Sequence, residues 1–499
     1  MIRRPSPDAT TALSLALACT AVYALCGGGR FFSVDEVGAF QLTRLWLEGE
    51  PIASSHVTWA GPGGRVWNVQ GPLLSVAAVP GYLFGRLLEL LLPASWAAAI
   101  AGPALGNIRG VLWGGEMRIA GASLTNSWVT GAVVALLFLW LRSLGITRRA
   151  ALLTAVVAAF ATLLCAHSKN LFSHGLETLG LLGAVLALGA ARARPSVRAF
   201  AVAGAWAAAL VLTRAQAAVT LPALGAYAWW AAGPERRIAR AAAFAGVAAL
   251  GPLLFAAWNL YRFGALTEMG YSPLYHFSFN FLEASYGHLF SVGRSLFIYS
   301  PPVALALLGW PEVLRRHRAE GLLVLGACGG LFLLYVSWSG WHGAWCFGNR
   351  FLLPTVPLLL VGLPYVLPGH PRARACALGV AIAAGLVVQT LGLAVHIAFI
   401  HHAYGYAEHP APLPYLFVPS QSQLATHADA LWRGYALDPW LLRLASEVGV
   451  GAALTLALPL VLAAAAGVMV MCRGPRWAGG RADEAREPVA ARRRRRGHS

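Results

Sequence analysis

The chain begins with the apolar run Thr11–Gly27 and then reads Phe31-Phe32-Ser33-Val34-Asp35-Glu36-Val37. An apolar run of this length is typical of a helix that crosses a membrane. The acidic pair Asp35 and Glu36 follows where such a helix meets water. A charged group is kept at that depth only when it faces water, a metal or a substrate. The stretch therefore predicts a first membrane span followed by a water-facing acidic site.

The composition extends this interpretation to the whole chain. Hydrophobic residues make up 58% of the sequence, charged residues only 12%, and the mean hydropathy is +0.61. Soluble domains carry roughly 25% charged residues. Apolar stretches of about 20 residues recur along the length, which predicts an all-α polytopic membrane protein. The seven cysteines form no CxxC pair, so neither a zinc site nor a disulfide framework is indicated.

The formal charge of +18 is an arginine charge, because Lys169 is the only lysine. The run Arg492–Arg496 has two interpretations: a nucleic-acid patch, or a cytoplasmic tail near anionic headgroups. We favour the second, because the surrounding sequence is membrane sequence, and we expect no nucleic-acid partner. Residues 473–499 are then a basic, disordered cytoplasmic tail. Residues 1–472 form one transmembrane domain.

We predict about twelve spans, counting the first helix. The other eleven lie at about 119–141, 150–166, 171–191, 199–212, 217–232, 241–258, 296–310, 321–336, 351–367, 375–399 and 448–472.

The arginines predict how these spans are oriented. If residues 30–118 form one outer loop, every inner loop is rich in arginine, as the positive-inside rule requires. If the apolar stretch 73–100 crossed the membrane, the later loops would change sides and the pattern would fail. We therefore expect a surface or re-entrant helix pair there. Both termini are then cytoplasmic, and the varied polar residues gather on the outer face.

Asp35 and Glu36 have a functional and a structural interpretation. In the first, Asp35 is a general base that takes a proton from an acceptor hydroxyl, and Glu36 orients the acceptor or helps to hold a cation. In the second, the pair caps a helix or pairs with Arg30. A long loop rich in Trp, His and Asn follows and favours the functional interpretation.

Four basic side chains are expected on the outer face, against the general arginine bias. They are Lys169, Arg214, Arg262 and Arg350. Each arginine either snorkels to outer headgroups or grips a phosphate, which guanidinium groups bind bidentately. A basic pocket beside an acidic base would suit a lipid-linked phosphate leaving group.

Further polar and aromatic residues are candidates to line a substrate site. They are His56, Asn68, Gln70, His174, Tyr271, Trp341, His342 and Asn349. For the tryptophans around Trp341 we favour an interfacial aromatic belt, with a sugar-binding surface as the alternative. His401, His402 and His409 with Glu408 match no standard metal-ligand spacing. We therefore name no metal ligand, and a divalent cation remains an open cofactor.

Several motifs resemble the GT-C superfamily of integral membrane glycosyltransferases, in the branch of protein O-mannosyltransferases and bacterial lipid A aminoarabinose transferases. Asp35-Glu36 resembles that family's acidic motif in the first loop, and residues 68–73 resemble the segment before its surface helices. Gly348-Asn349-Arg350-Phe351-Leu352-Leu353-Pro354 with Pro357 is similar to its Gly-x-Arg-Tyr-x-x-Pro-x-x-Pro pattern. One departure is that Glu177 lies deeper than the second carboxylate of many members.

The resemblance implies a membrane enzyme that moves a sugar from a polyprenyl-phosphate donor to an acceptor on the outer face of a bacterial inner membrane. It implies inversion at the anomeric carbon, with Asp35 as the base. The alternative is a transporter or flippase for a lipid-linked or anionic solute, but the spans carry few polar residues. A phosphotransferase ranks last, because no phosphate-cradling glycine loop of the usual form is present.

Overall fold

The computed structural model describes residues 6–53, 58–103, 114–270, 276–278, 280–366, 371–403, 413–435 and 437–473. Nearly all of the ordered elements in these residues are helices. One two-stranded antiparallel hairpin interrupts them, β1 (Thr58–Ala60) with β2 (Val66–Asn68). The predicted class, an all-α polytopic membrane protein, is confirmed.

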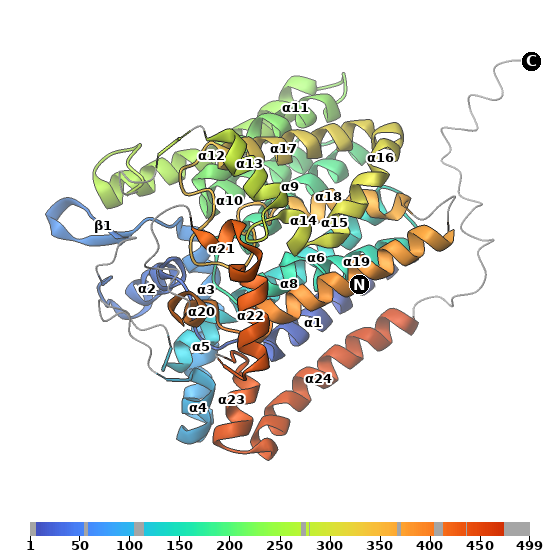
Figure 1. Cartoon of the computed structure of the whole chain (residues 1–499). Helices are drawn as coiled ribbons and strands as arrows, with labels where there is room; N and C mark the ends of the chain where they lie inside the picture. The colour runs from blue at the N-terminus through green and yellow to red at the C-terminus, as the bar shows by residue number, and fades with distance from the viewer. Residues whose placement is uncertain are drawn as a thin grey trace, which may run out of the picture.

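Eight helical segments in the described residues are long and apolar enough to cross a membrane. They are α1 (Pro7–Leu25), α3 (Pro72–Leu91), α5 (Met117–Ser123) joined to α6 (Thr125–Ser143), α9 (Ser173–Ala193), α12 (Arg237–Phe263), α17 (Arg318–Val336), α19 (Pro371–Ala394) and α24 (Val450–Arg473). At 1.5 Å per residue, about 20 residues match the roughly 30 Å hydrocarbon core. The helix α1 packs against both α6 and α24, and the three run side by side in Figure 1.

The other predicted spans are shorter or broken. The helix α10 (Val197–Thr213) is continuous but short. The broken ones are α7 (Arg148–Phe160) with α8 (Leu163–His167); η2 (Ala215–Thr220) with α11 (Leu221–Ala231); α14 (Leu296–Tyr299), α15 (Pro301–Ala306), η3 (Leu307–Gly309) and α16 (Trp310–Arg316); and α18 (Thr355–Leu359) with η4 (Leu360–Tyr365). Several breaks fall at proline, which lacks the N–H that continues a helix. Among the described residues, eight helices are continuous over a span length, and the expected count of about twelve crossings stays a prediction.

The remaining elements lie in the connections. They are α2 (Val34–Glu48), η1 (Pro62–Gly64), α4 (Ala94–Ala101), α13 (Phe281–Phe290), α20 (Ile397–Ala403), α21 (Pro414–Phe417), η5 (Pro419–Gln421), α22 (Gln423–Trp432) and α23 (Trp440–Glu447).

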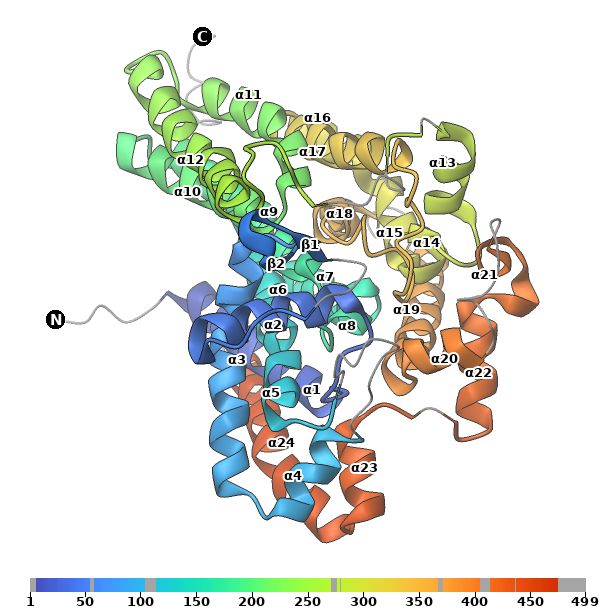
Figure 2. The same cartoon turned by 90° about the vertical axis from the view of Figure 1, so that its left-hand side faces the viewer.

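The stretch 73–100 folds as two helices, α3 and α4, separated at Pro93. The helix α3 has the length and hydropathy of a span, so its expected placement on the membrane surface stays a prediction. Figures 1 and 2 show α2, α3, α4 and α5 gathered at one end of the molecule, on the left in Figure 1 and facing the viewer in Figure 2.

The arginine-bearing helix ends meet one another. Arg142 at the end of α6 pairs with Asp8 at the start of α1, at 3.1 Å between Nε and Oδ2. Arg192 at the end of α9 pairs with Glu320 at the start of α17. The first contact joins α6 to α1, and the second joins α9 to α17. Tyr335, near the opposite end of α17, lines the pocket described below.

Close backbone packing joins α3 to α5, and it gives a test of the fold. A Cβ at Gly121 would clash with the carbonyl oxygen of Gly81 and with the backbone of Gly85. Because overpacking typically costs about 1–3 kcal/mol, we expect Gly121→Ala to lower the free energy of unfolding by that amount. Denaturant unfolding in detergent measures it. Gly189→Ala is the control, since a Cβ at Gly189 meets no atom within 4 Å. Equal stability of the two variants would refute this packing.

Candidate active site

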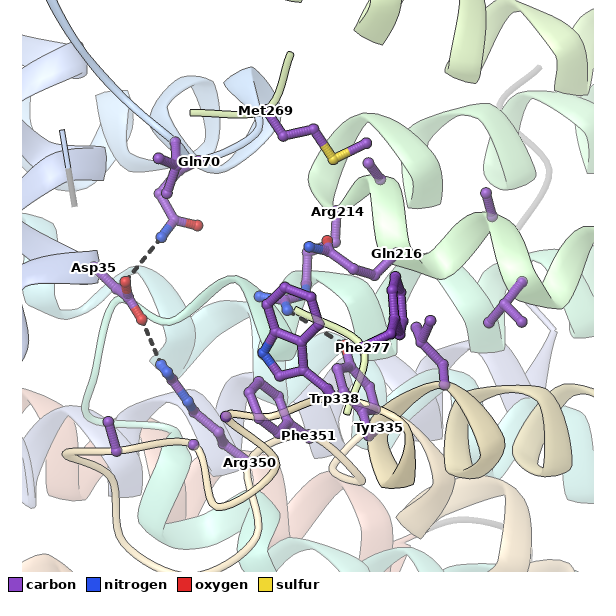
Figure 3. A pocket seen from close by; sticks show the side chains of 18 of the residues that line it. Asp35, Gln70, Arg214, Gln216, Met269, Phe277, Tyr335, Trp338, Arg350 and Phe351 are labelled. Atoms are coloured by element: carbon purple, nitrogen blue, oxygen red, sulfur yellow. Dashed lines mark hydrogen bonds and ion pairs between the residues drawn. The ribbon is translucent and has the colours of Figure 1, made fainter. Parts of the chain in front are cut away.

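One cavity of about 410 Å³ gathers several of the predicted residues. It lies where the start of α2, the end of α10, η2 and the end of α17 meet the loops that follow β2, α12 and α17 (Figure 3). We call it the Asp35 pocket. Its walls are formed by Asp35, Val69, Gln70, Arg214, Ala215, Gln216, Ala218, Val219, Met269, Gly270, Phe277, Leu334, Tyr335, Trp338, Gly340, His342, Gly343, Ala344, Arg350 and Phe351.

Asp35 lies in the first turn of α2, where Ser33 caps the helix by accepting the backbone N–H of Asp35. Its carboxylate is held from two sides (Figure 3). Gln70 Nε2 donates to Oδ1 at 3.1 Å, and Arg350 Nη1 donates to Oδ2 at 2.6 Å. The partial positive charge of a helix N-terminus also favours a carboxylate. Asp35 is therefore an acid held in a fixed position at the pocket wall.

Arg350 is fixed by aromatic rings as well as by Asp35. Its guanidinium carbon lies 4.5 Å from the ring centre of Phe172 and 5.3 Å from that of Phe351. Such cation–π contacts are worth about 0.5–2 kcal/mol. The rings orient the cation at the pocket wall without neutralising it.

Arg214 is the second cation of the pocket. Its Nε lies 3.2 Å from Oε2 of the buried Glu177, and its Nη1 donates to Ser173 Oγ at 3.0 Å. Its Nη2 donates to the Tyr335 hydroxyl at 3.3 Å. The Tyr335 ring stacks on Phe351 with centroids 4.4 Å apart. A cation, an aromatic platform and the Asp35–Arg350 pair thus share one pocket.

The side of the pocket formed by η2, α17 and two aromatic residues is mostly apolar. Ala218 and Val219 come from η2, and Leu334 comes from α17. Phe277 and Trp338 complete this side, with ring centroids 5.4 Å apart and nearly perpendicular planes. The Asp35 pocket therefore has one charged end and one apolar side.

Of the predicted residues, Asp35, Gln70, Arg214, His342 and Arg350 line this pocket. His342 accepts the backbone N–H of Ala344 through Nδ1 at 3.1 Å. Burial lowers the pKa of His342 to about 3, and the charges of Arg294 and Arg350 act in the same direction. His342 is therefore a neutral ring at neutral pH.

Glu36 does not face the pocket, and its expected role with acceptor or cation is not supported. Its carboxylate is fully buried and accepts the backbone N–H of Phe32 at 2.8 Å and of Leu171 at 2.7 Å. It ties the segment before α2 to the segment before α9. Burial raises the pKa of Glu36 to about 8, although the two N–H groups favour its charged form.

The shifted pKa of Glu36 predicts a pH-dependent stability. Because the folded pKa is raised above the usual 4.5, this contribution is fully present below about pH 4.5 and is lost as the pH rises towards about 8. We expect the free energy of unfolding to fall over this interval, and Glu36→Gln to flatten the fall. Unfolding in detergent at a series of pH values measures it. An unchanged slope in Glu36→Gln would remove Glu36 as its source.

Lys169 is not a pocket residue, which corrects its expected role. Its ammonium is buried and lies 2.7 Å from Asp438 Oδ2, while Arg30 Nε lies 3.1 Å from Oδ1 of the same acid. Burial opposes ionisation of Asp438, but the charge of Lys169, followed by those of His396 and Arg30, holds its pKa well below the usual range. Lys169 is part of a buried ion-pair cluster.

Arg262 and Asn68 lie behind the pocket wall instead of facing it. The buried guanidinium of Arg262 donates to the backbone oxygens of Asn68 and Gln70. Its other nitrogen, Nη2, donates to Asn259 Oδ1 at 2.8 Å. The side chain of Asn68 donates to the Gly38 carbonyl. Both residues therefore fix the loop that presents Gln70, and neither contacts the cavity.

Three other predicted lining residues are buried away from the cavity. His174 packs between Phe172 and Phe351. Trp341 packs on His288, and Asn349 donates to His288. His56 and Tyr271 lie outside the described residues.

Several pocket residues were not predicted from the sequence. Tyr335 and Leu334 end α17, and Gln216 and Val219 belong to η2. Phe351 follows Arg350 in the quoted Gly-Asn-Arg-Phe motif, and that adjacency was the one signal that indicated it. Glu177 was seen only as a deep carboxylate, and its pairing with Arg214 was not foreseen.

Within the described ranges, no three His, Cys, Asp or Glu side chains gather into a metal-binding group. Asp35 is the one acid among the residues that line the pocket there, and both of its oxygens already accept hydrogen bonds. The described residues thus do not fit a divalent cation, and we derive no step through one. Glu408 and His409 lie outside the described residues.

No family model and no curated protein matches the chain. Among solved structures, it is similar to the oligosaccharyltransferase of Archaeoglobus fulgidus. The apo form aligns with a TM-score of 0.45 and 13% identity, over 83% of this chain and 60% of that chain. The complex with Zn and sulfate aligns with a TM-score of 0.46 and 13% identity, over 84% and 58%.

The same oligosaccharyltransferase tethered to an acceptor peptide aligns with a TM-score of 0.45 and 12% identity, over 80% of this chain and 57% of that chain. This chain spans less than two thirds of the length of these structures. We draw no conclusion about its activity from this likeness.

Proposed function

We propose that the chain is a membrane glycosyltransferase that moves a sugar from a polyprenyl-phosphate donor to an acceptor hydroxyl. The observation that carries the proposal is the Asp35 pocket itself. One carboxylate and two guanidinium groups face a cavity of about 410 Å³, and one side of its wall is mostly apolar. A base, a site for a phosphate and a surface for a hydrocarbon chain are the three parts that this reaction needs.

The reaction proceeds as one displacement at the anomeric carbon. The acceptor oxygen attacks that carbon while the bond from the carbon to the phosphate oxygen breaks. The acceptor proton passes to the Asp35 carboxylate, and the bonding electron pair leaves with the polyprenyl phosphate. A single displacement inverts the anomeric configuration.

Arg350 and Arg214 stabilise the charge that develops on the leaving phosphate. A guanidinium group binds phosphate oxygens through two parallel N–H groups, so it provides both direction and charge. Both arginines are held in advance, Arg350 by its ring contacts and Arg214 by Glu177, Ser173 and Tyr335. Preorganised charge of this kind needs little rearrangement in the transition state.

The apolar side of the pocket is the place for the first part of the donor's hydrocarbon chain. Ala218 and Val219 of η2 face Leu334 of α17 across this side. Leu333, the neighbour of Leu334, is 60% exposed on the lipid-accessible surface of the helix. The hydrocarbon chain continues from this apolar side over the exposed face of α17.

The proposed cellular arrangement follows from the arginines. Under the positive-inside rule, three helix ends face the cytoplasm. They are the end of α6 with Arg142, the end of α9 with Arg192, and the end of α24 that leads to the basic tail. Arg214 and Tyr335 lie at the far ends of α10 and α17. The Asp35 pocket then opens on the outer face of a bacterial inner membrane.

Mass spectrometry of the cell envelope tests this function. We expect cells that lack the chain to lose one sugar from a glycan, lipid or protein acceptor and to accumulate the matching polyprenyl-phosphate sugar. The wild-type chain and an Asp429→Asn control should restore the modification, whereas Asp35→Asn should not. An envelope and a lipid-linked sugar pool that do not change on deletion would contradict the proposal.

A further inference from the structure

The Asp35 carboxylate is shared between two donors of different kinds. Its Oδ1 accepts from the neutral amide of Gln70, and its Oδ2 accepts from the cationic guanidinium of Arg350. A carboxylate can take a proton from a hydroxyl only through an oxygen that the hydroxyl can reach. Each carboxylate oxygen can accept a second hydrogen bond, so a hydroxyl can still reach Asp35, but an oxygen paired with a guanidinium is a weaker proton acceptor than one freed from it.

Gln70 is the donor whose position is fixed by its surroundings. Its backbone oxygen accepts from the buried Arg262 at 3.1 Å, and the preceding Asn68 is bound by the same guanidinium. The next residue, Gly71, packs against the carbonyl groups of Leu212 and Thr213 so closely that a Cβ there would clash. The loop that presents Gln70 therefore has little room to move.

Arg350 is the donor that a ligand can draw away. It lines the cavity, and the pocket's other cation, Arg214, also lines it. The positive charge of Arg214 acts on Arg350, so an anion placed between the two guanidinium groups relieves their repulsion. A phosphate offers more acceptor oxygens than a carboxylate and gains negative charge as its bond to the sugar breaks.

We propose that the donor phosphate takes Arg350 from Asp35 Oδ2 and thereby releases the base, while Gln70 keeps the carboxylate in position. This inference rests on the proposed function and adds to it the order in which donor and acceptor bind. No covalent bond changes in this step, because one hydrogen bond moves from a carboxylate oxygen to a phosphate oxygen. Donor binding then precedes productive acceptor binding. Arg350 is the exchanging residue and Gln70 the positioning residue.

Carbon-13 NMR of the aspartate carboxyl groups tests the exchange in the whole chain. The sequence has only five aspartates, Asp8, Asp35, Asp429, Asp438 and Asp483. Cell-free synthesis introduces labelled aspartate without scrambling, and Asp35→Asn assigns the Asp35 signal. The probe is dodecyl phosphate added to protein in dodecyl maltoside, whose alkyl chain is the same, so that only the phosphate is new.

We expect dodecyl phosphate to move the Asp35 signal and to leave the Asp8 and Asp438 signals in place. Arg350→Gln should move the Asp35 signal in the same direction without the probe, and its response to the probe should be lost. If the Arg350→Gln variant does not fold, the Arg350→Lys variant is used in its place. Arg433→Gln is the matched control, because it removes the exposed Asp429 pair at 2.9 Å and should move only the Asp429 signal.

A further variant separates positioning from binding. Gln70→Ala should leave the affinity for dodecyl phosphate, followed by phosphorus-31 NMR, within about twofold of wild type while it displaces the Asp35 signal. Bound probe with an unmoved Asp35 signal would overturn the exchange and leave the phosphate site standing. No binding of the probe at millimolar concentration would overturn the phosphate site, and the exchange with it.

Discussion

Asp35→Asn is expected to slow sugar transfer by about 10²–10⁴-fold, the usual contribution of a general base. The amide has nearly the shape of the carboxylate but cannot accept the acceptor's proton at neutral pH. It also gives up the ion pair with Arg350, whose Nη1 lies 2.6 Å from Oδ2. Transfer from a radiolabelled polyprenyl-phosphate sugar in membranes, at saturating donor, measures the loss.

Asp429→Asn serves as the control for this substitution. Asp429 is a partly exposed acid on α22, outside the pocket, that pairs with Arg433, so its loss should leave transfer unchanged. The melting temperature of each purified variant shows whether the fold is kept. Full transfer by a folded Asp35→Asn chain would remove Asp35 from the mechanism.

Asp438→Ala is expected to have the largest effect on stability. The carboxylate is buried and lies 2.7 Å from Lys169 Nζ and 3.1 Å from Arg30 Nε. Its removal leaves two buried cations without their partner, which typically costs about 3–5 kcal/mol. Denaturant unfolding in detergent measures the free energy of unfolding.

Asp8→Ala is the matched comparison, because Asp8 also pairs with a cation but is partly exposed. Exposed pairs contribute about 0–1 kcal/mol, so the Asp8 variant should be close to wild type. Asp438→Ala with the stability of Asp8→Ala would show that the buried cluster does not hold these segments together.

The sequence singled out Asp35 for a physical reason, and its role as the base stays a prediction. An ionised residue directly after an apolar run must face water, a partner or a cavity, and Asp35 lines the pocket. Arg214 and Arg350 were recognised because they break the arginine bias of the inner loops. Their shared pocket depends on contacts between α2, α10 and the loop after α17, which residue spacing does not encode.

The wrong assignments share one cause. Lys169 and Arg262 were read as phosphate ligands because a cation near the outer face needs an anion. The anion of Lys169 is Asp438, which lies 269 positions away in the chain. Arg262 binds backbone oxygens of a loop about 190 positions away. Local sequence shows that a buried cation needs partners but does not identify them.

The breaks within the expected spans could not be read from the sequence for a related reason. Apolar composition is the same in a continuous helix and in one broken by proline, as in the segment that holds α14, α15 and α16. Burial against other helices satisfies the broken ends, and hydropathy does not report that burial.

The central claim is that this chain carries out covalent sugar transfer on one face of the membrane, and purified protein in sealed vesicles tests it most directly. Vesicles of both orientations receive a radiolabelled polyprenyl-phosphate sugar and an envelope extract as acceptor source. We predict acceptor-linked label only where the Asp35 pocket faces the extract, and none with Asp35→Asn. Movement of intact donor across the bilayer, with no label joined to any acceptor, would contradict the claim and favour a transporter.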